Sequence, residues 1–317
     1  MQLGDCMKER ARLKRLKQYY ALYEQIYKTP TMSLYDLART TRLSRNSVSK
    51  YLKEMYEHQI LKGPHLAMKS GSNYTEYVYL MKFTDPQKVF KGLKGFPHVV
   101  YYAVTFGDWN TMLVADRLLD FSQLVGFRSI VYQGVKYYSY TPKVSYTTWS
   151  ESFSKIYEHL QCTPVVKEKN RVFTRVDWGD DEWKLYYAFK FNLRKKITPL
   201  LQETKVRYEP YRQWRETLHN HCTVHTGFYP EGYKTYTCYC FLLSTQYHSM
   251  VTSLFSLFPT TSYFTEMDDR LLVFVHVVSA EVKRNLFCLI YDLKAKGIIK
   301  EFKQAVILFH GFHIETL

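Results

Sequence analysis

Cationic and hydrogen-bonding side chains gather between residues 42 and 53, at spacings that place them on one side of a helix. They are Arg42, Ser44, Arg45, Asn46, Ser49, Lys50 and Lys53. Short hydroxyl and amide groups suit base edges and phosphates, and cations suit the phosphate backbone. The pattern therefore predicts a surface that reads double-stranded DNA in the major groove. The plainer alternative is the solvated face of an ordinary helical hairpin.

Two short helices must position that face. Apolar residues recur at helical spacing on the opposite side, at Leu34, Leu37, Ala38, Val48, Leu52 and Met55. Ser33 and Ser44 are suitable N-cap residues, because a serine hydroxyl accepts a hydrogen bond from a free helical N–H group. We therefore expect a helix-turn-helix over residues 33–62.

A wing is expected after the second helix. A short strand near Ile60, a turn at residues 69–73 and a strand over 74–83 have the order of a β-hairpin. Lys62, His65 and Lys69 would then be available to touch phosphates. A plain solvated hairpin explains the same residues nearly as well.

Composition favours a folded protein with a basic N-terminal part. The 317 residues are 46% hydrophobic and 17% aromatic, and the net charge is +15. Residues 1–75 hold 14 lysines and arginines against 6 acidic residues, as expected for phosphate attraction. The six cysteines form no CxxC pair, and no apolar run suggests a signal segment or a membrane span. We expect a cytoplasmic protein without a membrane partner.

Residues 76–145 read as strand, helix, strand, strand, helix, strand. The helices are expected near Asp85–Leu93 and Leu119–Val125, and the hairpin between the middle strands contains Gly107-Asp108. This βαββαβ order predicts a ferredoxin-like sandwich, with an antiparallel sheet covered on one face by two helices. The uncovered face is expected to serve as a dimer surface.

A winged helix-turn-helix followed by this βαββαβ unit resembles the leucine-responsive and asparagine-responsive regulator (Lrp/AsnC) family. The resemblance implies a transcriptional regulator that dimerises through the ferredoxin-like sheets and senses an amino-acid-like effector. Phe106, Gly107 and Asp108 stand where the family has its effector-binding hairpin.

The chain also repeats itself at an offset of about 162 residues. Tyr74 and Tyr77 match Tyr236 and Tyr239, and Phe96-Pro97 matches Phe258-Pro259. The fold class expected for the whole chain is thus α+β, a winged helix-turn-helix plus ferredoxin-like unit occurring twice. The expected divisions are 1–75, 76–145, a connector over 146–180, a second winged helix at 181–234 and a second ferredoxin-like unit at 235–317.

The second copy is expected to contact DNA only weakly. Arg207, Arg212 and Arg215 favour phosphate, but Glu209, Glu216 and Glu231 oppose it. Its hairpin reads Met267-Asp268-Asp269 and lacks the glycine, so an equivalent effector site there is doubtful.

Catalytic and metal signatures are sparse. The run from His219 to His225 crosses a helix end into a strand, so its ligands are not expected to converge on a metal. No phosphate-binding loop or nucleophile motif occurs. We therefore expect no metal, no cofactor and no enzymatic activity.

One alternative remains from another class, because siroheme decarboxylases share the two-domain plan and include fused forms. Such an enzyme would need basic and histidine side chains that converge on a tetrapyrrole. A sensor that has lost DNA binding is a third possibility.

Overall fold

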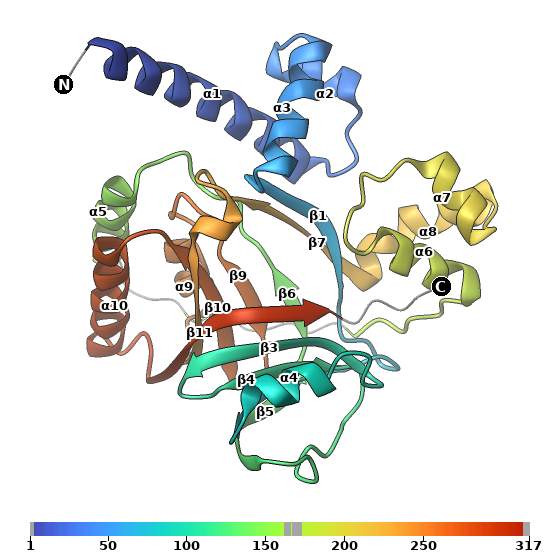
Figure 1. Ribbon diagram of the computed structural model, residues 1–317, viewed down its shortest axis with the longest axis vertical. Coiled ribbons are helices and arrows are strands. Elements are labelled where there is room, and N and C mark those ends of the chain that lie inside the picture. The colour runs from blue at the N-terminus through green and yellow to red at the C-terminus, as the bar shows by residue number, and fades with distance from the viewer. Residues whose placement is uncertain (1–2, 162–165, 167–172, 313–317) are drawn as a thin grey trace.

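The computed structural model describes residues 3–161, 166 and 173–312 (Figure 1). Cys162 and much of the predicted connector lie outside these residues. The fold is α+β with antiparallel sheets, as predicted. Two helical units lie on one side of a large sheet, and a two-stranded sheet joins them to it (Figure 1).

The first helical unit contains α1 (Leu3–Lys28), α2 (Leu34–Thr41) and α3 (Arg45–Glu57). The side chains of Ser33 and Ser44 cap α2 and α3, each accepting a backbone hydrogen bond at 3.1 Å. Arg42 takes the left-handed conformation that ends α2. Leu37, Val48 and Met55 are fully buried against α1, so the predicted helix pair is present.

The second helical unit repeats this plan with a larger aromatic core. Its helices are α6 (Asp180–Phe189), α7 (Ile197–Thr204) and α8 (Tyr208–His221). Phe189, Tyr211 and Trp214 pack together at its centre. Neither α7 nor α8 has a side-chain hydrogen bond at its N-cap, because Lys196 and Arg207 occupy those positions.

The predicted wing hairpin does not form, since its two strands belong to different sheets. β1 (Leu61–Met68) pairs with β7 (Cys222–Phe228), the strand that follows α8 in the second unit. The strand expected to complete the wing is β2 (Glu76–Phe83), which pairs with strands of the large sheet. The strand after each helical unit thus pairs with the strand after the other unit, in place of a strand from a local hairpin.

The large sheet combines two ferredoxin-like units. The first has β2, α4 (Pro86–Gly92), β3 (Val99–Gly107), β4 (Thr111–Ala115) and β5 (Phe127–Lys136). The second has β8 (Thr237–Ser244), α9 (His248–Phe255), β9 (Tyr263–Glu266), β10 (Arg270–Val277), α10 (Ala280–Ala295) and β11 (Glu301–Phe312). The strand order β5-β2-β4-β3-β11-β8-β10-β9 shows the same permutation twice, and β3 pairs with β11 to join the units.

The helix predicted over 119–125 is absent. Residues 116–126 form turns and bends, and Phe121 in this segment packs against β2 and β4. The side chain of Asp120 accepts a hydrogen bond from the backbone of Ser122 at 2.9 Å. A local bond of this kind competes with helix formation, which explains the error.

The sheet is strongly curled. β5 and β6 (Tyr138–Tyr140) are separated by one residue, yet they occupy opposite edges of the strand order. Tyr137 bridges the edges by donating its N–H to the carbonyl oxygen of Glu266 at 2.9 Å. Val78, Met112, Cys240 and Leu272 from both units pack together inside the curl. The two ferredoxin-like units therefore pair within one chain, and a homodimer through their strands stays a prediction.

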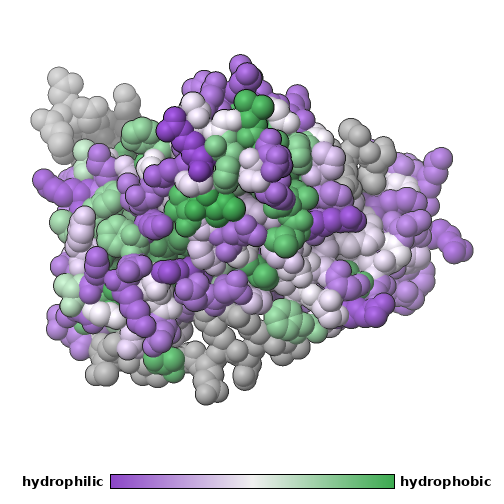
Figure 2. Space-filling model, turned by 90° about the horizontal axis from the view of Figure 1, so that it is seen from below, coloured by the Kyte–Doolittle hydropathy of each residue, from purple (hydrophilic) through white to green (hydrophobic). Residues whose placement is uncertain are grey.

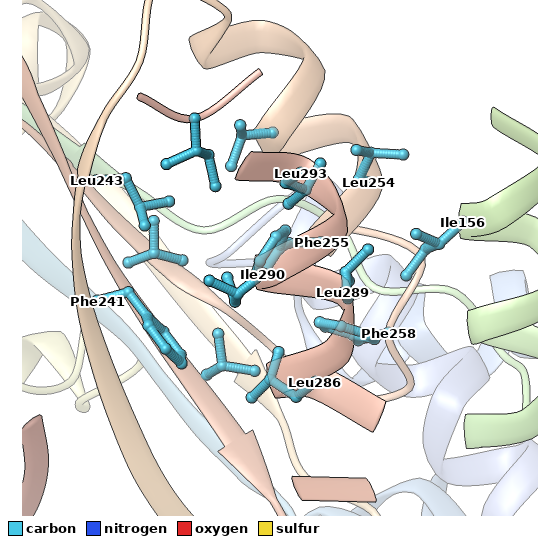
Figure 3. Packing of buried hydrophobic residues seen from close by; sticks show 14 of the residues in the cluster. Ile156, Phe241, Leu243, Leu254, Phe255, Phe258, Leu286, Leu289, Ile290 and Leu293 are labelled. Atoms are coloured by element: carbon cyan, nitrogen blue, oxygen red, sulfur yellow. The ribbon is translucent and has the colours of Figure 1, made fainter. Parts of the chain in front are cut away.

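The outer faces of the sheet differ in their cover. α9 and α10, with α5 (Trp149–His159), bury a large core that includes Phe241, Phe255 and Leu289 (Figure 3). Among the described residues, α4 and the 116–126 loop cover the outer face of the first unit. On the face seen in Figure 2, hydrophobic side chains lie in several separate patches among hydrophilic ones.

Candidate functional site: a basic and aromatic cavity between the two sheets

A cavity of about 440 Å³ lies between the β1–β7 pair, the end of α6 and the large sheet. Its volume falls within the roughly 300–1,000 Å³ typical of small-molecule sites. Both halves of the chain contribute to the wall. The lining includes Lys62, His65, Glu76, Tyr101, Lys136, Tyr186, Lys190, Phe191, Tyr229, Tyr233, Cys238, Tyr263, His276, His310 and Phe312.

Lysines provide the positive charge of the cavity. The ammonium group of Lys62 lies 3.9 Å from the centroid of the Tyr233 ring, and burial together with Lys234 lowers its pKa. Lys136 forms a buried ion pair with Glu76, which also accepts a hydrogen bond from the Tyr74 hydroxyl at 2.8 Å. Lys190 lies near the ring of Tyr186, 5.5 Å from its centroid.

Histidines on the wall are held in the neutral form. The rings of His65 and His225 stack at 5.1 Å, and desolvation lowers the pKa of His65 to about 4. His276 is only 4% exposed, and desolvation lowers its pKa to about 4 as well. Neutral imidazoles of this kind can accept or donate a hydrogen bond, or bind a metal held by a ligand.

His276 lines the cavity, and one nitrogen of its buried ring has no hydrogen-bond partner among the described residues. Its Nδ1 lies 3.3 Å from the carbonyl oxygen of Thr261, to which it donates in one tautomer. Its Nε2 then has a lone pair, and within the described residues this atom has no hydrogen-bond partner. The rings of Tyr229 and Tyr233 pack against this imidazole, with centroids 4.9 and 5.1 Å away, and keep it from solvent.

Aromatic rings form the cavity's outer wall. Phe191, from the end of the α6 unit, lies 5.4 Å from Phe312 at the end of β11, and both rings are partly exposed. Tyr101 contacts Phe312 at 5.2 Å and His310 at 5.7 Å. Flat rings in this arrangement are suited to stack on a planar ligand.

Cys238 is a lining residue without nucleophilic character. Burial raises the pKa of its thiol to about 12, so the thiolate is scarce near neutral pH. Across the described residues, no group of three or more histidine, cysteine or acidic side chains is arranged to hold a metal ion. The lysines, histidines and aromatic rings of the lining are suited to anion binding, stacking and proton transfer.

The residues predicted to bind DNA fall into two sets. Arg42, Ser44, Arg45, Asn46, Ser49, Lys50 and Lys53 are exposed on and beside α3. Lys62 instead lines the cavity, and Lys69 donates to the carbonyl oxygen of His219 at 2.7 Å. Neither lysine lies on a local wing, and their contact with DNA stays a prediction.

The second-copy arginines make local or interdomain contacts. Arg212 pairs with Glu209 at 2.8 Å, and Arg215 donates to Thr31 of the first helical unit. Arg207 is exposed at the start of α8. Their weak contact with DNA stays a prediction.

The predicted effector hairpin contacts β11 and so helps to connect the two ferredoxin-like units. Asp108 exchanges two hydrogen bonds with the backbone of Gln304, at 2.8 and 2.7 Å. At Gly107, whose φ is +150°, a Cβ atom would lie 2.4 Å from the Gln304 carbonyl oxygen. Phe106 is 73% exposed, and none of the three residues lines the cavity. Their role in effector binding stays a prediction.

Sequence reasoning missed most of the cavity. Glu76, Lys136, Lys190 and His276 come from β2, β5, the end of α6 and β10, and no local spacing links them. His276 carried one usable signal, since it is a lone imidazole inside the apolar strand Leu271–Val277.

Comparisons with known proteins yield only distant structural similarity. No family model and no curated protein matches the chain. A crystal structure of the siroheme decarboxylase NirDL is 11% identical, covers 94% of this chain and 93% of that chain, and gives a TM-score of 0.48. The same enzyme in complex with an iron-uroporphyrin III analogue is 10% identical over 92% and 93% of the two chains, with a TM-score of 0.43.

These findings correct one expectation. The sequence was interpreted as that of a protein without enzymatic activity, whereas both similar structures are of a decarboxylase. They give no support to a DNA partner. Within the described residues, no helix is both long and apolar enough to span a membrane.

Proposed function

We propose that the chain is an enzyme that binds a carboxylated tetrapyrrole in the central cavity and removes carboxyl groups from it. The observation that carries the proposal is the convergence of lysines, neutral histidines and aromatic rings on one cavity. This is the constellation that the tetrapyrrole alternative requires.

Each kind of lining residue has a task in such a reaction. Lys62 and Lys190 attract ligand carboxylates, because an ammonium group in a partly desolvated site favours an anion. The rings of Tyr101, Tyr186 and Phe191 provide stacking surfaces for the macrocycle.

Decarboxylation also needs a proton. Breaking the bond to the carboxyl group releases CO2 and leaves an electron pair on the side-chain carbon, which must then be protonated. Lys62 is our candidate donor, since its lowered pKa makes it a stronger acid than an exposed lysine. Apolar lining residues such as Val78 and Ile307 would limit competition from water.

The test is an absorption titration with siroheme and with carboxylated porphyrins, followed by mass spectrometry of the recovered ligand. We expect a saturable shift of the Soret band and loss of CO2 from at least one ligand. Lys62→Gln should weaken both signals, whereas Lys300→Gln, a change at an exposed lysine outside the cavity, should leave them unchanged. Absence of a shift with every tetrapyrrole would refute the proposal.

We propose DNA contact by α3 as a second candidate function. It is favoured by the exposure of Arg45, Asn46, Ser49 and Lys50 on the side of the helix opposite buried Val48 and Leu52. A mobility-shift assay on DNA upstream of the coding sequence, repeated across salt concentrations, tests it. Arg45→Ala with Lys50→Ala should abolish salt-sensitive retardation, and equal retardation by the variant would remove α3 from consideration.

A further inference from the structure

The cavity carries little net charge for its size. Its charged lining residues among those described are Lys62, Lys136, Lys190 and Glu76, which amounts to a formal charge of +2. The lining histidines add little to this value near neutral pH, because burial lowers the pKa of His65 and of His276 to about 4.

The charges are also separated from one another. Lys62 lies against Tyr233, near the start of β1. The Glu76–Lys136 pair lies by the other end of β1, where Ser70 donates to the carbonyl oxygen of Lys136. The lining also includes apolar side chains of the large sheet, among them Val78, Val114 and Phe274.

Within the described part of the chain, the aromatic pair Phe191 and Phe312 has one lining cation beside it, since the ammonium group of Lys190 lies 5.7 Å from the centroid of the Phe191 ring. Phe191 and Phe312 contact each other at 5.4 Å and are 41% and 44% exposed. Lys190 can neutralise one carboxylate at this place, and a further carboxylate held against the rings would lose water without gaining a counter-charge, which is unfavourable.

Resting on the proposed function, we propose that the ligand is a sparsely carboxylated tetrapyrrole, with about two acidic side chains, rather than an octacarboxylate such as uroporphyrin. Each carboxylate beyond those that the lysines neutralise must be desolvated against an apolar or aromatic wall. Binding should therefore weaken as acidic groups are added to the same macrocycle.

The experiment compares three iron-free porphyrins with the full chain at neutral pH. They are dicarboxylate deuteroporphyrin, tetracarboxylate coproporphyrin and octacarboxylate uroporphyrin. Dissociation constants are obtained from the Soret shift and checked by equilibrium dialysis. We expect deuteroporphyrin to bind at least about tenfold more tightly than uroporphyrin, with coproporphyrin between them.

A variant and an uncharged ligand separate charge from shape. Lys62→Gln should weaken deuteroporphyrin about tenfold, the loss expected for one charged contact. The same variant should bind the dimethyl ester of deuteroporphyrin as the unchanged chain does, since the ester has no carboxylate. Lys300→Gln serves as the matched control at an exposed position outside the cavity.

The outcomes distinguish the two proposals. Equal or tighter binding of uroporphyrin would overturn the charge inference and leave the proposed function standing. Failure of all three porphyrins and of siroheme to bind would overturn both. An equal loss of diacid and diester binding in Lys62→Gln would show that Lys62 shapes the cavity rather than neutralises a carboxylate, and would also overturn the inference.

Discussion

The two ferredoxin-like units have the same strand order but very different cover. The second unit buries α9, α10 and α5 against its outer face, and Phe255, Leu289 and Ile290 in that core are fully buried (Figure 3). In the first unit α4 has no buried residue of its own, and a loop completes the cover. The second unit therefore buries more side chains beneath its helices than the first unit does.

The halves also differ where they meet the cavity. Val78 on β2 and Cys240 on β8 both pack inside the curl, so the strands can be aligned at these residues. Two positions earlier stand Glu76 and Cys238, and both line the cavity. The first half thus contributes a buried ion pair where the second contributes a neutral thiol. The repeated strand order thus encloses a cavity whose wall differs between the two halves.

The largest expected effect comes from two phenylalanines, one on α9 of the second unit and one on α4 of the first. Phe255→Ala should lower the free energy of unfolding by about 3–5 kcal/mol, the usual loss for a fully buried ring. Phe90→Ala should cost roughly half as much, because Phe90 on α4 is only partly buried. Urea unfolding of both variants measures the difference, and equal losses would contradict the contrast between the units.

A smaller effect is expected from acid. The pKa of His276 is lowered from 6.5 to about 4 by desolvation, with Lys62 and His310 adding repulsion. Between these values the unfolded chain binds a proton that the native chain does not, so stability falls as pH decreases. The contribution is absent above pH 6.5 and reaches at most about 3 kcal/mol below pH 4.

His276→Gln should remove this part of the pH dependence. Unfolding free energies of the variant and the unchanged chain, measured from neutral pH down to the acid limit, should differ in slope over that window. His159→Gln, at an exposed position on α5, is the control. Parallel slopes for His276→Gln and the unchanged chain would show that the imidazole is not held neutral by burial.

The smallest effect concerns helix caps in the two helical units. Ser44→Ala should cost about 1 kcal/mol by removing the hydroxyl that accepts from Ser47. Arg207→Ser in the second unit should instead add up to about 1 kcal/mol, since α8 has no side-chain cap. Thermal unfolding reports both changes, and a stabilising Ser44→Ala would mean that the first unit does not depend on its caps.

The sequence was sufficient for elements whose signals are local. Serine caps and the spacing of Leu37, Val48 and Met55 located α2 and α3, and the repeat at about 162 residues indicated the duplication. Strand pairing was not local. β1 and β7 are separated by more than 150 residues, and the turn near Gly71 suggested a hairpin that the fold does not contain.

The cavity was harder to predict from the sequence, because its residues also come together through non-local strand pairing. Lys62 was interpreted as a wing residue because its neighbours in sequence resemble one, but its side chain lies against Tyr233 from the other half of the chain. Glu76 and Lys136 are also far apart in sequence and meet only because β2 and β5 pair. Convergence of this kind depends on which strands pair, and local spacing patterns in one sequence carry little information about that pairing.

Hydrogen exchange of the chain with and without a bound porphyrin tests the central claim most directly. If the cavity between β1, β7 and the large sheet holds the ligand, slowed exchange should concentrate in residues 61–68, 186–191 and 227–233, and α3 should be unchanged. Slowed exchange confined to α2 and α3, or to the outer faces of the sheet, would show that the ligand binds elsewhere and would contradict the account.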